Sequence, residues 1–93
     1  MVSVNRTGDF MGVKFARYKT ELFVTEIVEG GPFFSTAIDV GDKVVSINGR
    51  KSKYINTVQE ALDLMRSKST ISLNIVRPDP KTDPGYLWLM ENL

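Results

Sequence analysis

Apolar and polar residues alternate along much of this chain, and alternation at a period of two predicts β-strands. Val13 and Phe15 follow this pattern near the N-terminus, and Ile71, Leu73 and Ile75 follow it in the last such segment. Strands are predicted over residues 1–5, 12–17, 22–27, 43–47, 50–53 and 69–76. The fifth of these segments is short and exposed, and a loop is its alternative.

Residues 57–67 have helical rather than strand spacing. The segment opens with Thr57 followed three residues later by Glu60, which is the pattern of a capping box at a helix N-terminus. Two apolar stripes then run along the helix, one made of Val58, Leu62 and Met65 and the other of Ala61 and Leu64. We expect one stripe to face the core and the other to face a gap at the edge of a sheet. A second, short helix is predicted over 33–37.

The order of these elements predicts an α+β fold. We expect a small five- to six-stranded, partly open antiparallel β-barrel or sandwich capped by two helices. Residues 1–77 would form the compact domain, and residues 78–85 a proline-rich linker. Residues 86–93 would be an apolar C-terminal tail.

The tail is too apolar for a solvated chain end, and two interpretations are open. In the first, it is an extra helix or strand that packs on the domain's own surface with Trp88 as the anchor. In the second, Leu93 is an apolar residue with a free carboxylate that enters a groove on a neighbouring molecule. The second would give head-to-tail self-association.

Composition limits the kind of site that the chain can build. A chain of 93 residues with 42% hydrophobic content suits one domain with little apolar material to spare for an internal pocket. We therefore expect a surface groove. The net charge of +1 gives no overall field to attract nucleic acid, so no nucleic-acid partner is expected.

The chain contains no His and no Cys. It therefore lacks the commonest general base and a thiol nucleophile, and its acidic residues show no metal-loop or paired-acid spacing. We expect a protein that is not an enzyme and needs no cofactor or metal. The absence of cysteine fits a reducing compartment, so a cytoplasmic location is expected, with partners as the route to the membrane-associated cortex. Asn5-Arg6-Thr7 matches the N-glycosylation pattern and is interpreted as a chance match.

Several motifs follow one another in an informative order. They are Phe10-Met11-Gly12-Val13, the apolar strand over 22–27, Gly30-Gly31-Pro32, Gly41-Asp42-Lys43-Val44-Val45-Ser46-Ile47-Asn48-Gly49 and Thr57-Val58-Gln59-Glu60-Ala61. Together, over residues 1 to about 77, they resemble a PDZ domain. The segment that begins at Gly41 is the most specific, whereas the first loop departs from the family's Gly-Leu-Gly-Phe at Phe10 and Val13. The resemblance implies a scaffold module that binds the C-terminal peptides of other proteins.

The resemblance also implies how a peptide carboxylate would be held. The backbone N–H groups of Met11, Gly12 and Val13 would meet it, because a terminal carboxylate needs several N–H groups that point the same way. Arg6 occupies the position of a basic residue that helps to hold the carboxylate in this family. We expect that a bulky residue at Gly12 would abolish binding and leave the fold largely intact.

The peptide would then add a strand antiparallel to the strand that begins at Gly12, with the helix as the opposite wall. The residues that the resemblance assigns to the side-chain pockets are Phe10, Lys14, Phe15, Thr25, Val58, Leu62 and Met65. With Met11 and Val13, Phe15 and Met65 would surround the last peptide side chain and require it to be apolar. Lys14 would favour an acidic residue elsewhere in the peptide.

Val58 sits where family members that prefer Ser or Thr two residues before the peptide's end carry His. No side chain on this wall offers a hydrogen-bond donor or acceptor to a peptide hydroxyl. Burying a hydroxyl without a hydrogen bond costs about 1–3 kcal/mol. We therefore expect an apolar residue at that position as well. The alternative function is binding of phosphoinositides or an acidic membrane through surface cations. Those cations are Lys14, Arg17, Lys19, Arg50, Lys51, Lys53, Arg66 and Lys68.

Overall fold

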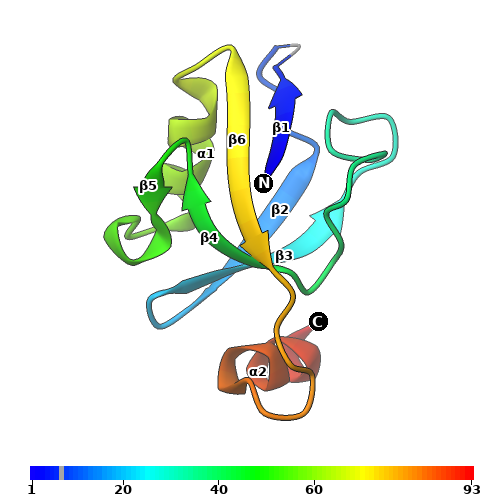
Figure 1. Cartoon of the computed structure of the whole chain (residues 1–93), viewed down its shortest axis with the longest axis vertical. Coiled ribbons are helices and arrows are strands. Elements are labelled where there is room, and N and C mark those ends of the chain that lie inside the picture. Colours follow the sequence, from blue (N-terminus) through cyan, green and yellow to red (C-terminus); the bar gives the residue numbers. More distant parts are fainter. Residues whose placement is uncertain (7) are drawn as a thin grey trace.

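The computed structural model describes residues 1–6 and 8–93 and shows one antiparallel sheet with two α-helices (Figure 1). The strands are β1 (Val2–Asn5), β2 (Val13–Tyr18), β3 (Glu21–Ile27), β4 (Lys43–Ile47), β5 (Arg50–Lys51) and β6 (Thr70–Val76). Their order in the sheet is β1-β6-β4-β3-β2, with β5 paired to β4. The predicted α+β fold with six antiparallel strands is confirmed. Thr7, the last residue of the glycosylation tripeptide, lies outside the described residues.

The sheet bends where β3 meets β4. These strands pair at only two positions, Leu22 with Val44 and Phe23 with Lys43, whereas β2 and β3 pair along their whole length. In Figure 1, β2 and β3 cross β4 and β6 obliquely. The bend allows α1 (Val58–Arg66) to pack against both β2 and β4 and to cover the core between them.

The predicted N-cap at Thr57 is confirmed, but the return bond from Glu60 reaches Asn56 instead of Thr57. The Glu60 N–H donates to Thr57 Oγ1 over 3.0 Å, and Glu60 Oε2 accepts from the Asn56 N–H over 3.0 Å. Ala61 and Met65 are fully buried in the core, while Val58 and Leu62 are only partly buried against it. The apolar surface of the helix therefore extends beyond the core.

The short helix predicted over 33–37 is wrong, because the segment forms turns. The Phe34 N–H donates to the Gly31 carbonyl over 3.2 Å, and the Thr36 N–H donates to the Phe33 carbonyl over 3.3 Å. The Thr36 hydroxyl also donates to that carbonyl over 2.8 Å. This carbonyl is the one an α-helix would pair with the Ala37 N–H, so a local side-chain bond competes with the helix. The turn nevertheless buries Phe33 completely.

The tail forms a second helix, α2 (Pro84–Asn92), in place of the one expected at 33–37. Asp83 accepts from the Tyr86 N–H over 3.0 Å and Pro84 occupies the first turn, as is typical of a helix start. The Trp88 ring lies 5.3 Å from the Tyr18 ring, and Leu89 is buried. The tail therefore packs on the domain, as the first interpretation has it, although the division at residues 77 and 85 stays a prediction. Neither α1 nor α2, the helices of the described part of the chain, is long and apolar enough to cross a membrane.

Candidate functional site

The loop before β2 has the tight shape that an anion-binding turn needs. Gly12 has a φ of +67°, and its carbonyl accepts from the Val28 N–H over 2.9 Å. A Cβ at Gly12 would lie 2.9 Å from the Gly31 Cα and 3.2 Å from the Pro32 Cδ. The loop is therefore docked on the turn after β3. The expectation that a bulky residue at Gly12 would leave the fold intact is at odds with this contact.

β2 is the last strand in the sheet order, so its outer edge has no neighbouring strand among residues 1–6 and 8–93. α1 packs across from it. At the N-terminal end of β2 the two elements and the loop enclose an open cavity of about 230 Å³. Its lining is Asp9, Phe10, Met11, Gly12, Val13, Lys14, Val28, Leu62 and Arg66. We call the space between β2 and α1, with this cavity at one end, the β2–α1 groove.

The cavity brings together six of the residues assigned from the sequence. They are Phe10, Met11, Gly12, Val13, Lys14 and Leu62. Phe15 and Met65 do not line it, and both are buried in the core. Val58 is partly buried at the N-terminal end of α1, and Thr25 is partly buried on β3. The β2 side of the cavity thus carries Val13 beside Lys14, and the α1 side carries Leu62 beside Arg66.

Arg6 lies outside the cavity lining and has other partners. Its guanidinium donates to the Lys68 carbonyl over 3.1 Å, to the Gly8 carbonyl over 3.2 Å and to Asp9 Oδ1 over 3.4 Å. These bonds join the end of β1 to the turn after α1 and to the start of the loop. In the described structure, Arg6 thus supports the loop from outside.

Arg66 lines the cavity, although sequence reasoning placed it only among the surface cations. Its Nε donates to the Asp9 carbonyl over 3.4 Å, and its Nη1 lies 3.6 Å from Asp63 Oδ1. The sequence signal for it was its place directly after Met65, at the C-terminal end of α1.

Arg17 links β2 to the segment that precedes α1. It donates from β2 to the carbonyl of Ile55, which lies just before α1 and is buried. Lys14 projects to solvent and pairs with Glu26 on β3 over 3.4 Å. Such an exposed pair contributes at most about 1 kcal/mol, so Glu26 competes only weakly with an acidic peptide residue.

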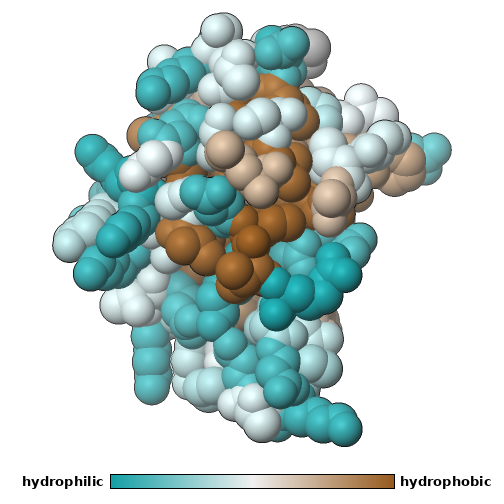
Figure 2. Space-filling view, in the orientation of Figure 1, coloured by the Kyte–Doolittle hydropathy of each residue, from teal (hydrophilic) through white to brown (hydrophobic). Residues whose placement is uncertain are grey.

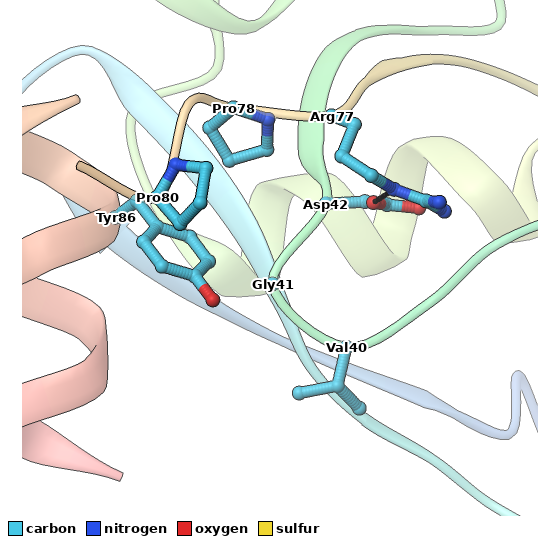
Figure 3. A pocket seen from close by; sticks show the side chains of 7 residues that line it. All are labelled: Val40, Gly41, Asp42, Arg77, Pro78, Pro80 and Tyr86. Carbon is cyan, nitrogen blue, oxygen red and sulfur yellow. Dashed lines mark hydrogen bonds and ion pairs between the residues drawn. The ribbon is translucent and has the colours of Figure 1, made fainter. Parts of the chain in front are cut away.

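Two further features lie away from the groove. A cavity of about 150 Å³ separates the segment before α2 from the start of β4 (Figure 3). There Asp42 is buried and accepts from Arg77 Nε and from the Asp39 N–H, so its charge is already compensated. Figure 2 shows an apolar patch over β4 and β6, where Val45 and Val76 are exposed.

The sequence matches the family model described as PDZ domain over residues 9–83. This chain belongs to the PDZ domain family. PDZ domains are protein interaction modules that bind C-terminal peptides, and they are generally not enzymes. The matched range contains the docked loop, the open edge of β2 and the whole of α1, which are the parts of the PDZ domain that form the β2–α1 groove.

Proposed function

We propose that this PDZ domain binds the free C-terminus of a partner by adding the peptide as a strand to β2. The observation that carries the proposal is the outer edge of β2, which pairs with no strand in the described part of the chain and faces the partly apolar wall of α1. A strand edge offers N–H and C=O groups to an extended peptide, so pairing supplies affinity at any sequence. The groove is directional because the docked loop closes one end.

The carboxylate would sit at the backbone N–H groups of Met11, Gly12 and Val13. The positive φ of Gly12 supports this role. When right-handed and left-handed backbone conformations alternate in a tight turn, successive N–H groups point into one concavity. The cavity at this loop is large enough for a carboxylate and the start of the last side chain. An amidated peptide would lose the negative charge that these groups attract.

The last side chain and the one two positions before it would both be apolar. Leu62 lines the cavity beside Met11 and Val13, and burying one aliphatic side chain there is worth roughly 1.5–3 kcal/mol. Further along α1, Val58 is partly buried and carries no hydrogen-bonding group. A Ser or Thr facing it would be buried unpaired, at a cost of about 1–3 kcal/mol.

A screen of random C-terminal peptides tests the proposal. The expected result is enrichment of Val, Leu, Ile or Phe at the last and third-last positions, and loss of binding when the enriched peptides are amidated. Enrichment of Ser or Thr at the third-last position would contradict the role given to Val58. Binding that survives amidation would contradict the role given to the loop.

Binding to phosphoinositides or an acidic membrane is the competing proposal, and the positions of the cations favour it less. Lys14 pairs with Glu26, Arg66 lies near Asp63, and Arg17 is turned toward the Ile55 carbonyl. The test is binding to vesicles that contain phosphatidylserine, measured at physiological salt. Binding under these conditions would support the membrane proposal, because weak charge contacts are lost as ionic strength rises.

Head-to-tail association through Leu93 is also open to test. Leu93 is 63% exposed, but α2 is helical to Asn92, and strand addition needs an extended chain. The last turn of α2 would have to unwind before Leu93 could reach a groove. Sedimentation of the chain and of the Leu93→Asp variant would decide, since an equal mass for both at high concentration rules out this contact.

A further inference from the structure

We infer that Arg66, and not Arg6, supplies the side-chain cation that faces the carboxylate of a bound C-terminus. This inference rests on the proposed function and deepens it, because it assigns the charge partner at the closed end of the β2–α1 groove. The first observation is position: Arg66 lines the cavity together with Phe10, Gly12 and Leu62, whereas Arg6 does not.

The second observation is how Arg66 is held. It is the last residue of α1, and its Nε reaches across the cavity mouth to the carbonyl of Asp9, just before Phe10. Its Nη1 has only a long contact to the exposed Asp63 carboxylate, and among the described residues its Nη2 has no hydrogen bond or ion pair. A guanidinium has five N–H donors, so donors remain for a carboxylate.

The third observation is that the Nε and Nη1 donors of Arg6 are already bonded to other partners. Two of its three contacts go to backbone carbonyls, Lys68 and Gly8, which a peptide carboxylate could not replace without opening the turns that they join. The third goes to Asp9, which already gives Arg6 an acidic partner. Arg6 is therefore a positioning residue for the loop.

Electrostatics at the end of α1 point the same way. The unpaired carbonyls at a helix C-terminus carry about half a negative charge, which would repel a carboxylate held at the neighbouring loop. Asp9, which lines the cavity, and Asp63, which lies beside Arg66, add negative charge. A cation at the last helical position offsets this field where the ligand's charge would lie.

The test uses a pool of octapeptides with Val, Leu or Ile at the last and third-last positions and random residues elsewhere. The pool is made once with a free carboxylate and once as the amide, and the dissociation constant of each form is measured for the folded domain. The dissociation constant of the amide pool divided by that of the free-acid pool gives the contribution of the carboxylate to binding. We call this quotient the ratio. Melting curves confirm that each variant is folded.

Arg66→Gln is expected to reduce this ratio roughly five- to twentyfold, between the effect of an exposed ion pair and that of a charge-assisted hydrogen bond. Arg66→Lys should recover part of it, because the charge remains. The matched control is Lys68→Gln, which removes one exposed charge two residues away and should change the ratio by less than about twofold. Arg6→Gln should lower the melting temperature and leave the ratio unchanged.

A wild-type ratio retained in Arg66→Gln and lost in Arg6→Gln would overturn the inference and leave the proposed function standing. Equal binding of the acid and amide pools by the wild-type domain, or no binding of either pool, would overturn both.

Discussion

At the scale of single residues, Gly12 determines whether the loop before β2 can form. It combines a left-handed backbone with contact against the Gly31 backbone, and each condition alone disfavours a side chain. The loop is thus part of the fold as well as part of the site. Variants at Gly12 would mix lost stability with lost binding, so binding is better tested at Arg66.

Gly12→Ala is expected to destabilise the domain more than Gly49→Ala. Both glycines have positive φ, at +67° and +87°, which costs Ala about 1–2 kcal/mol. A Cβ at Gly49 meets nothing within 4 Å, whereas one at Gly12 approaches the Gly31 Cα to 2.9 Å. Overpacking adds about 1–3 kcal/mol at Gly12 only. Urea unfolding measures both, and equal losses would contradict the docking of the loop on Gly31.

The sequence was sufficient for residues whose role follows from spacing, and insufficient for those whose role depends on where a long side chain ends. Leu62 follows from helical periodicity and lies in the cavity lining. The choice between Arg6 and Arg66 depends on the turn after α1, which brings the Lys68 carbonyl to Arg6. No local pattern encodes that contact between residues 62 positions apart.

At the scale of elements, the strands and α1 were predicted because their patterning agrees with their burial. The segment over 33–37 was predicted as a helix because it lies between two turns and is apolar, and there the Thr36 hydroxyl and the short length favour turns. For the tail the sequence pattern leaves a helix and a strand both open, because the apolar residues of α2 surround the helix instead of forming one stripe. Asp83 followed by Pro84 was the start signal that could have predicted it.

α2 is attached to the sheet by a cluster of three charges. Lys43 Nζ lies 2.6 Å from both Glu21 Oε2 and Asp83 Oδ2. Burial lowers the pKa of Lys43, but hydrogen bonds to Asp83 and Glu21 outweigh it and raise the pKa overall. The hydrogen bond from Lys43 lowers the pKa of Asp83 below its ordinary value, although partial burial opposes this.

Asp83→Asn is expected to lower the free energy of unfolding of α2 by about 1 kcal/mol at pH 7. The amide keeps the helix cap but loses the ion pair to Lys43. A lowered pKa in the folded state means that the charge stabilises above the ordinary value near 4 and stops doing so as the pH falls through the folded value. The difference in the free energy of unfolding between wild type and Asp83→Asn should therefore disappear below about pH 4.

The fluorescence of Trp88, the single tryptophan, reports on α2 during unfolding at each pH. Asp79→Asn is the control, because Asp79 is an exposed linker acid with the same charge change. A difference for Asp83→Asn that is equal at pH 7 and pH 3 would show that the cap, and not the ion pair, is responsible.

At the scale of the whole molecule, α2 and the candidate site occupy opposite ends of β2. α2 contacts Tyr18 at the C-terminal end of β2 and Phe23 on β3, whereas the cavity lies beside Val13 at the N-terminal end. Figure 1 shows α2 below the sheet and away from α1. The tail therefore packs on this PDZ domain without covering the loop that would receive a carboxylate.

The most direct test of peptide binding by strand addition is an NMR titration of backbone amides with a free-acid octapeptide taken from the C-terminal screen. The largest shifts are expected at Met11, Gly12 and Val13, along the rest of β2, and on α1 from Val58 to Arg66. Shifts concentrated at Lys51 and Lys53, or around Trp88, with the loop amides unmoved, would contradict peptide binding by strand addition.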